Sequence, residues 1–205
     1  MSEQERSAHD DLLPATPKAM PRAGGPFRRW LGRGLLRMLG WKLEGEFPEQ
    51  QKLVLAAAPH TSNWDFVLAM CLIMALGVRV SYLMKKEAFI WPFGALFMRL
   101  GGIPIDRGAA EDIVDQIAGW YRDHEKVWVV ITPEGTRSKV DKWKTGFLRI
   151  AERAEVPVCV VAWDYPSKCM HIGPCWETTG DHIADVEAIR SYISKNYTGR
   201  HPAKQ

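Results

Sequence analysis

The sequence predicts a single-domain α/β fold whose sheet is mixed but mostly parallel and is flanked by helices. Its 205 residues suit one domain with one large core. Short apolar runs alternate with segments long enough for helices, which is typical of strands and helices packed in layers. These runs lie at residues 53–57, 80–84, 103–105, 127–132 and 158–163. A basic amphipathic helix is expected before the first of them.

Composition excludes several classes of protein. Hydrophobic residues make up 46% and charged residues 25%, close to ordinary globular proteins and unlike disordered or fibrous chains. The net charge of +3 is too small to argue for nucleic acid as a partner. The first residues offer no apolar signal core, so we expect a cytoplasmic protein. No Cys-x-x-Cys spacing occurs, so we expect reduced thiols and no zinc or redox motif at Cys71, Cys159, Cys169 and Cys175.

The N-terminal part divides into a tail and a helix. Residues 1–25 are rich in proline and glycine and show no helical or strand period, so a mobile tail is expected. Residues 26–42 combine aromatic and leucine side chains with Arg29, Arg33 and Arg37, which recur every four residues. This pattern predicts a basic amphipathic helix of the kind that lies in a membrane interface. A helix packed on the core with a solvated arginine face is the alternative, and Gly32 weakens either helix.

The main domain is expected over residues 43–197, with a short tail at 198–205. Residues 109–124 and 181–197 each carry one apolar face, as helices packed on a sheet do. The longest apolar run, 66–78, is well short of the ~20 residues that an α-helix needs to span a bilayer. It is hydrophobic on nearly every side of a helix, so we expect it to be buried.

The first chemistry-bearing segment is residues 58–65, which follows a buried strand and precedes the long apolar run. Within one helix His60 and Asp65 would lie about 140° apart around the axis and could not easily meet. A helix that begins at Ser62 or Asn63 removes this conflict, because either residue is a good N-cap. Asp65 then falls in the first helical turn and can accept a hydrogen bond from one imidazole nitrogen.

A histidine oriented in this way has its other nitrogen free to act as a general base near neutral pH. The plainer interpretation is that Asp65 caps the helix and His60 only completes a loop. A serine hydrolase using Ser62 would need a Gly-x-Ser-x-Gly elbow, which is missing. A metal-dependent hydrolase is also disfavoured, because no ligand spacing such as His-x3-His occurs among His9, His124, His171, His182 and His201.

Two further segments place cations at strand ends. Residues 133–138 follow a strand with a turn in which Gly135 frees the backbone, Thr136 offers a hydroxyl and Arg137 offers a planar fork suited to phosphate. A turn with a surface arginine is the alternative. Residues 101–107 form a glycine-flanked short strand that ends in Arg107, for which the alternative is a solvated pair with Asp106.

In this order the segments resemble the motifs of the lysophospholipid (glycerol-phosphate) acyltransferase superfamily. His60 and Asp65 match its His-x4-Asp motif, and residues 101–107, 133–138 and 156–158 match its later blocks. The resemblance implies that the histidine is the general base, that the aspartate orients it and that no acyl-enzyme forms. It also implies that the acceptor site is shaped by Arg107, Glu134, Gly135, Thr136 and Arg137, to which Lys144 adds positive charge.

The resemblance implies a peripheral enzyme of the cytoplasmic membrane face that takes acyl-CoA or acyl-carrier protein as co-substrate, with no metal or cofactor. Lysophosphatidic acid is the default acceptor, and other lysolipids or specialised hydroxyls are alternatives, as is a non-catalytic lipid-binding relative. Pro104 stands where many members have an aromatic residue, and Val160 replaces a proline of the fourth block. These departures concern the acceptor more than the chemistry. Residues 89–97 are expected either to line an acyl tunnel or to touch membrane.

Overall fold

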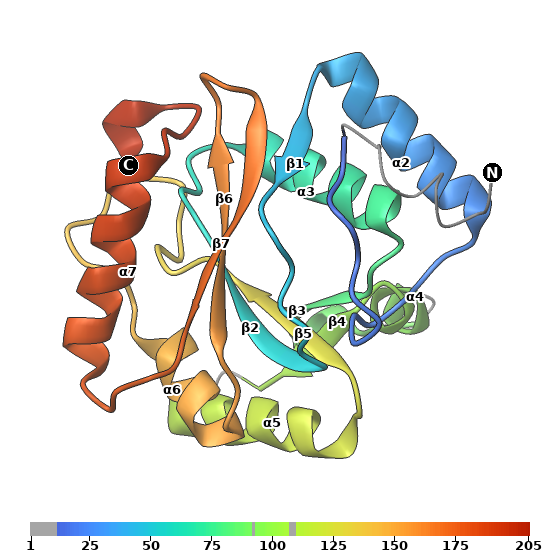
Figure 1. Ribbon diagram of the computed structural model, residues 1–205. Helices are drawn as coiled ribbons and strands as arrows, with labels where there is room; N and C mark the ends of the chain where they lie inside the picture. The colour runs from blue at the N-terminus through green and yellow to red at the C-terminus, as the bar shows by residue number, and fades with distance from the viewer. Residues whose placement is uncertain (1–11, 92, 107–109) are drawn as a thin grey trace.

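The computed structural model describes residues 12–91, 93–106 and 110–205, which form a layered α/β domain (Figure 1). Seven strands make one sheet in the order β1-β7-β6-β2-β5-β3-β4. Strands β6, β2, β5, β3 and β4 are mutually parallel, and β7 runs antiparallel to β6 with β1 parallel to β7. The predicted mixed, mostly parallel sheet is therefore confirmed. The strands are β1 (Lys42–Glu44), β2 (Lys52–Ala57), β3 (Val80–Lys85), β4 (Gly102–Ile105), β5 (Val127–Ile131), β6 (Val158–Asp164) and β7 (Cys169–Trp176).

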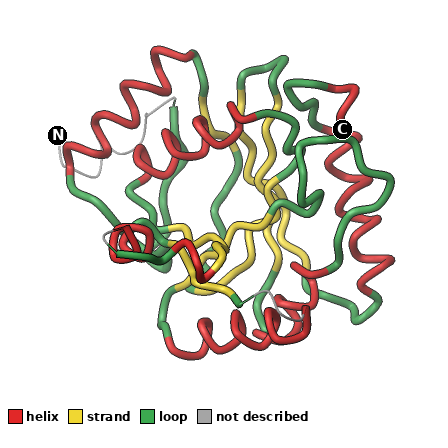
Figure 2. The backbone as a smooth tube through the Cα atoms, turned by 180° about the vertical axis from the view of Figure 1, so that it is seen from behind, coloured by secondary structure: helices red, strands yellow, loops and turns green. Residues whose placement is uncertain are grey.

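Helices cover both faces of the sheet, as the tube seen from behind shows (Figure 2). Along β2, Val54 and Ala56 point into a core shared with α5, α6 and α7, whereas Leu53 and Leu55 point into a second core shared with α2 and α3. This alternation is the two-residue period of a strand that is buried on both faces. The helices are α2 (Pro26–Leu39), α3 (Asn63–Leu76), α4 (Phe93–Arg99), α5 (Ala110–Asp123), α6 (Gly146–Ala154) and α7 (His182–Asn196).

The predicted N-terminal helix is present and packs along α3 (Figure 1). Gly32 is buried at the contact, where an added Cβ would lie 2.4 Å from the backbone nitrogen of Ala75. The glycine that weakens α2 thus allows the two helices to approach closely. The helix ends at Gly40, which is left-handed with φ 70°, so the expected final residues fall outside it. Trp41 is buried in the core.

Three expectations about burial need correction. A mobile tail is expected over residues 1–25, of which 1–11 lie outside the described residues, but Leu12, Leu13 and Met20 are buried in the core cluster that contains α2 and α3. Three scattered apolar residues carry no period, which is why the sequence pattern did not indicate their burial. The C-terminal segment from 198 also packs on the domain, with Gly199 buried. Helix α3 was expected to be buried all round, yet Phe66 is 61% exposed at its N-terminal end.

Across the part of the chain that the structure describes, no helix combines the length and the hydropathy that crossing a bilayer requires.

Candidate active site

The candidate site is built where β2 ends and α3 begins. Ser62 is the N-cap of α3, and its hydroxyl accepts a hydrogen bond from the backbone N–H of Trp64 at 3.2 Å. The carboxylate of Asp65, three residues later, accepts a hydrogen bond from the backbone N–H of Ser62 at 2.9 Å. This capping box satisfies N–H groups that a helix start leaves without partners. It also turns the Asp65 side chain back toward the loop that carries His60.

His60 and Asp65 meet as predicted. Nδ1 of His60 lies 3.2 Å from Oδ2 of Asp65, a close contact that does not meet the geometry of a hydrogen bond. The Asp65 side chain is fully buried and the His60 side chain is 15% exposed. One edge of the imidazole therefore faces the carboxylate while the ring keeps some access to solvent. A proton acceptor for a substrate hydroxyl needs this arrangement.

The carboxylate of Asp65 is held in its charged form. Burial alone would raise its pKa, but the adjacent His60 ring and hydrogen bonds from Tyr165 and the backbone of Ser62 outweigh burial and lower the pKa. The backbone N–H of Thr61 donates a further bond to Oδ2 at 2.9 Å. At neutral pH the group is therefore an ionised carboxylate, which can stabilise a protonated His60.

Glu134 supports the loop from the neighbouring strand. It follows β5, and its Oε1 accepts a hydrogen bond from the backbone N–H of His60 at 2.8 Å. The side chain is buried, Oε2 has no hydrogen-bond partner among the described residues, and burial raises the pKa of this carboxyl. Glu134 was expected in the acceptor site, and the structure places it against the backbone of the candidate base.

The remaining predicted site residues lie around the same turn. Gly135 is left-handed with φ 65°, and Lys144 packs over it, where an added Cβ would lie 2.9 Å from the Lys144 ammonium nitrogen. Thr136 and Arg137 are exposed. Arg107 lies outside the described residues. Its neighbour Asp106 pairs with Lys86 at 2.9 Å, a contact that the sequence did not suggest.

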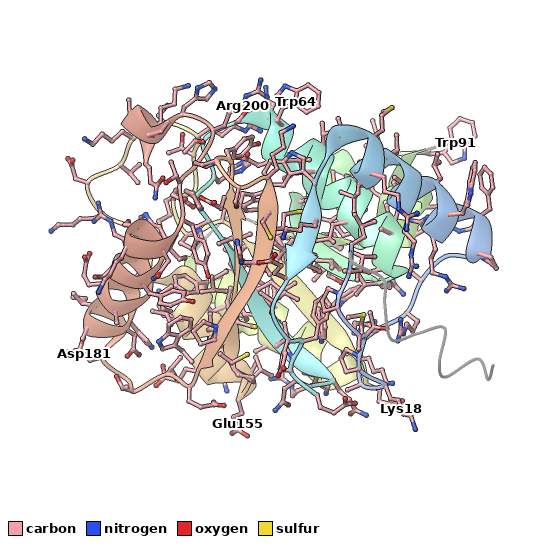
Figure 3. The ribbon with its side chains drawn as sticks, turned by 45° about the horizontal axis from the view of Figure 1, so that its top comes forward. Lys18, Trp64, Trp91, Glu155, Asp181 and Arg200 are labelled. Carbon is pink, nitrogen blue, oxygen red and sulfur yellow. The ribbon has the colours of Figure 1, made fainter. Side chains whose placement is uncertain are left out.

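Sequence reasoning missed two side chains at this site. Tyr165, at the end of β6, donates a hydrogen bond from its hydroxyl to Oδ1 of Asp65 at 2.6 Å. Arg200, near the C-terminus, lies over the ring of Trp64 with its guanidinium carbon 5.2 Å from the ring centre (Figure 3). Tyr165 reaches the site because β2, β5 and β6 are parallel and neighbouring, so that their carboxyl ends share one edge of the sheet.

Comparison with known proteins identifies the family of this chain. The acyltransferase family matches residues 42–164, which include both segments that form the site and more than half of the chain. The chain belongs to the acyltransferase family. Its structure is similar to that of the 1-acyl-sn-glycerophosphate (LPA) acyltransferase PlsC from Thermotoga maritima, with 18% identity and a TM-score of 0.59, over 82% of this chain and 76% of that one. At this identity the likeness concerns the fold. No curated protein matches the sequence.

The acyltransferase has a mostly apolar cavity of about 350 Å³ that is lined by residues of α3, β3 and β5 among others. Its wall includes Phe66, the residue after Asp65, and Thr132, two residues before Glu134, whereas His60, Asp65 and Glu134 are not among its described lining residues. Arginine side chains of residues 28, 79 and 99 also line it. Most of the other apolar lining side chains come from α3, β3 and β5 and include Met70, Ile73, Val80, Leu83 and Val130.

Metal-type side chains of the acyltransferase gather elsewhere. Among the described residues, Glu44, Cys169 and His171 bring one ligand atom each within 4.8 Å of one another. Neither His60 nor Asp65 belongs to that group. The ammonium of Lys42 forms an ion pair with Glu44, so the charge of this carboxylate is already balanced by a side chain.

Proposed function

We propose that this acyltransferase moves a fatty acyl group from the thioester of acyl-CoA or acyl-carrier protein to the hydroxyl of a lysophospholipid-type acceptor such as lysophosphatidic acid. The observation that supports it best is the contact of 3.2 Å between His60 and the fully buried Asp65. A buried, ionised carboxylate against one imidazole nitrogen leaves the other nitrogen as a base, the arrangement used for activating hydroxyl groups.

The proposed reaction is direct transfer. Nε2 of His60 takes the proton of the acceptor hydroxyl while the hydroxyl oxygen attacks the thioester carbonyl. The carbon–sulfur bond then breaks, and the leaving thiolate receives the proton from the imidazolium. Asp65 keeps the proton of the neutral ring on Nδ1 and stabilises the imidazolium between the two steps. The product is an ester and a free thiol, and no acyl group is attached to the protein.

We assign the acceptor phosphate to the turn after β5. Arg137 is exposed there, and Lys144 packs on Gly135 one residue beyond Glu134. An arginine fork binds two phosphate oxygens at once, and the lysine adds a second positive charge. Thr136 offers a hydroxyl, and the resemblance also assigns Arg107 to this site. The fatty acyl chain then fits the apolar cavity that begins at Phe66.

Membrane association is proposed from the exposed apolar side chains beside this cavity. On α2, Phe27, Trp30 and Met38 are each about 70% exposed or more. Phe66 on α3 is also exposed. Trp91, before α4, is 92% exposed and projects from the surface (Figure 3). With the arginines of α2 these side chains provide what an interfacial helix needs, which supports peripheral binding at the cytoplasmic face of a membrane.

The test is mass spectrometry of the lipids that purified protein makes from a panel of acceptors, offered with acyl-CoA and with acyl-carrier protein. Acylated lysophosphatidic acid is the expected product. Products only from acceptors without phosphate would keep the enzyme and move the acceptor class. If no donor and acceptor pair gave an ester while lipid binding persisted, the protein would be a non-catalytic lipid-binding relative.

A further inference from the structure

The hydrogen bonds of Asp65 are unevenly divided between its two oxygens. Oδ2 faces the backbone N–H groups of Thr61 and Ser62 and the ring of His60. Oδ1 receives the Tyr165 hydroxyl at 2.6 Å, the donor to this atom among the described residues. A carboxylate with no exposed surface needs donors on both oxygens, because an unpaired buried charge is costly. Tyr165 therefore supplies the hydrogen bond that Oδ1 needs and holds this end of the carboxylate.

The structure holds Tyr165 from several sides. Its backbone N–H donates to the carbonyl of Thr198 at 2.9 Å, and its ring meets the edge of Trp41 with the ring centres 4.9 Å apart. Asp164, the residue before it, accepts from the backbone N–H of Thr198 at 3.0 Å. The C-terminal segment and the start of β1 thus fix the phenol, whose direction does not depend on Asp65 alone.

We propose that Tyr165 is a positioning residue that fixes the Asp65 carboxylate, and through it the imidazole of His60, for the proposed acyl transfer. This inference rests on the function proposed above. Burial and the bond to Asp65 raise the pKa of the Tyr165 phenol, so it remains a hydrogen-bond donor at neutral pH. A donor of this kind disperses the carboxylate charge and limits how strongly Asp65 attracts the protonated base.

The other charged groups that face this cluster are not themselves altered when the phenol is replaced. Glu134 approaches from the turn after β5 and Arg200 from the C-terminal segment, and each acts electrostatically on Asp65 or Tyr165. A change of pH dependence in a Tyr165 variant therefore reports the lost hydroxyl rather than an altered neighbour.

The test replaces Tyr165 with Phe, with Tyr192→Phe as the matched control. Tyr192 also loses a hydroxyl hydrogen bond, to Tyr197 at 3.1 Å, but does not touch Asp65. In Tyr165→Phe we expect kcat to fall about 10- to 100-fold, the usual range for partners that orient functional groups, with KM little changed. The acidic limb of the kcat/KM profile should move to higher pH, because the freed carboxylate attracts the imidazolium more strongly. The control should show neither change.

Two further measurements keep the inference testable on its own. Site-specific 3-fluorotyrosine at position 165 retains shape and hydroxyl but donates more strongly, so the acidic limb should move to lower pH. Proton NMR titration of the His60 ring, assigned by the signal missing in His60→Gln, should show the same midpoint shift as kinetics and needs no turnover. Absent transfer by the wild-type protein would overturn the proposed function. An unchanged His60 titration and unchanged kcat in folded Tyr165→Phe would overturn the role of Tyr165.

Discussion

Two regions of this acyltransferase differ in polarity and in exposure to solvent. The dyad edge, at the carboxyl ends of β2, β5 and β6, is polar and buried and consists of His60, Asp65, Glu134 and Tyr165. The apolar flank, on α2, α3 and the loop before α4, is hydrophobic and open and consists of Phe27, Trp30, Phe66 and Trp91. In the first region hydrogen bonds hold both oxygens of Asp65 and one oxygen of Glu134, and the His60 ring lies against Asp65. In the second, apolar side chains face outward.

Under the proposed function, the difference shows how one small domain can combine ester chemistry with a lipid substrate. Preorganised polar groups act strongly only where water is excluded and their positions are fixed. A lipid surface instead requires apolar area, which binds without directional contacts. If different forces organise the two regions, substitutions in them should affect different properties of the protein, and by different amounts.

The largest effect is expected for Asp65→Ala. This change leaves buried N–H groups of Thr61 and Ser62 and the Tyr165 hydroxyl without an acceptor, so the free energy of unfolding should fall by about 3 kcal/mol or more. Asp115→Ala is the control, since its pair with Arg153 at 2.9 Å is exposed and should cost less than ~1 kcal/mol. Urea denaturation measures both. Equal losses of unfolding free energy in the two variants would contradict the claim that buried hydrogen bonds stabilise the dyad edge.

The pH dependence of stability sharpens this prediction. Since the pKa of Asp65 is lowered by folding, its contribution is complete above the unfolded-state pKa of about 3.9 and disappears as the pH falls through the folded-state value. The stability gap between the wild type and Asp65→Ala should therefore narrow below about pH 4.

The next effect concerns Arg137→Lys in the proposed phosphate site. Lysine keeps the charge but cannot bind two phosphate oxygens at once. For a phosphate-bearing acceptor, kcat/KM should therefore fall by a factor that corresponds to about 1.5–3 kcal/mol of transition-state stabilisation. Acylation of an acceptor without phosphate is the control and should be nearly unaffected. Equal losses for both acceptors would mean that Arg137 supports the turn and not the phosphate.

A change at the contact between α2 and α3 should affect stability alone. In Gly32→Ala the new Cβ would lie 2.4 Å from the backbone of Ala75, so overpacking should cost about 1–3 kcal/mol. Gly34→Ala on the same helix meets nothing within 4 Å and should stabilise the protein by about 0.5–1 kcal/mol. Thermal unfolding separates the two. A neutral Gly32→Ala would show that the helices are not closely packed.

The smallest effect is expected for Trp30→Ser on the apolar flank. Binding to anionic liposomes should weaken by ~1 kcal/mol, about fivefold, while stability hardly changes. Ile183→Ser removes an equally exposed apolar side chain from α7 and should leave binding unchanged. Sedimentation with liposomes measures both. Point changes are preferable to removing residues 1–41, because that segment contributes Leu12, Met20 and Leu36 to the core.

Much of this fold could be predicted from local patterns in the sequence. The five parallel strands, α5, α7 and the pairing of His60 with Asp65 depend on periodicity or on cap chemistry within a few residues, and such features are readable in one sequence. Short or interrupted elements were missed. Strand β1 has three residues, and β7 contains a glycine and a proline.

Contacts between distant segments were not predictable in the same way. Tyr165 lies 100 positions from Asp65, and Glu134 lies 74 positions from His60. Only the sheet order brings these residues together, and a single sequence does not contain that order. The burial of Leu12 and Leu13 depends likewise on a chain that returns to β1, where the N–H of Leu43 donates to the carbonyl of Leu12 at 2.9 Å.

The most direct test of the account is the transfer rate of His60→Ala, measured beside its circular dichroism and unfolding curve. The imidazole is partly exposed and fills no core position, so the variant should fold like the wild type. Loss of a general base should reduce the rate of ester formation by about 10²–10⁴. A folded His60→Ala protein that turned over at a near-normal rate would contradict the assignment of His60 as the base.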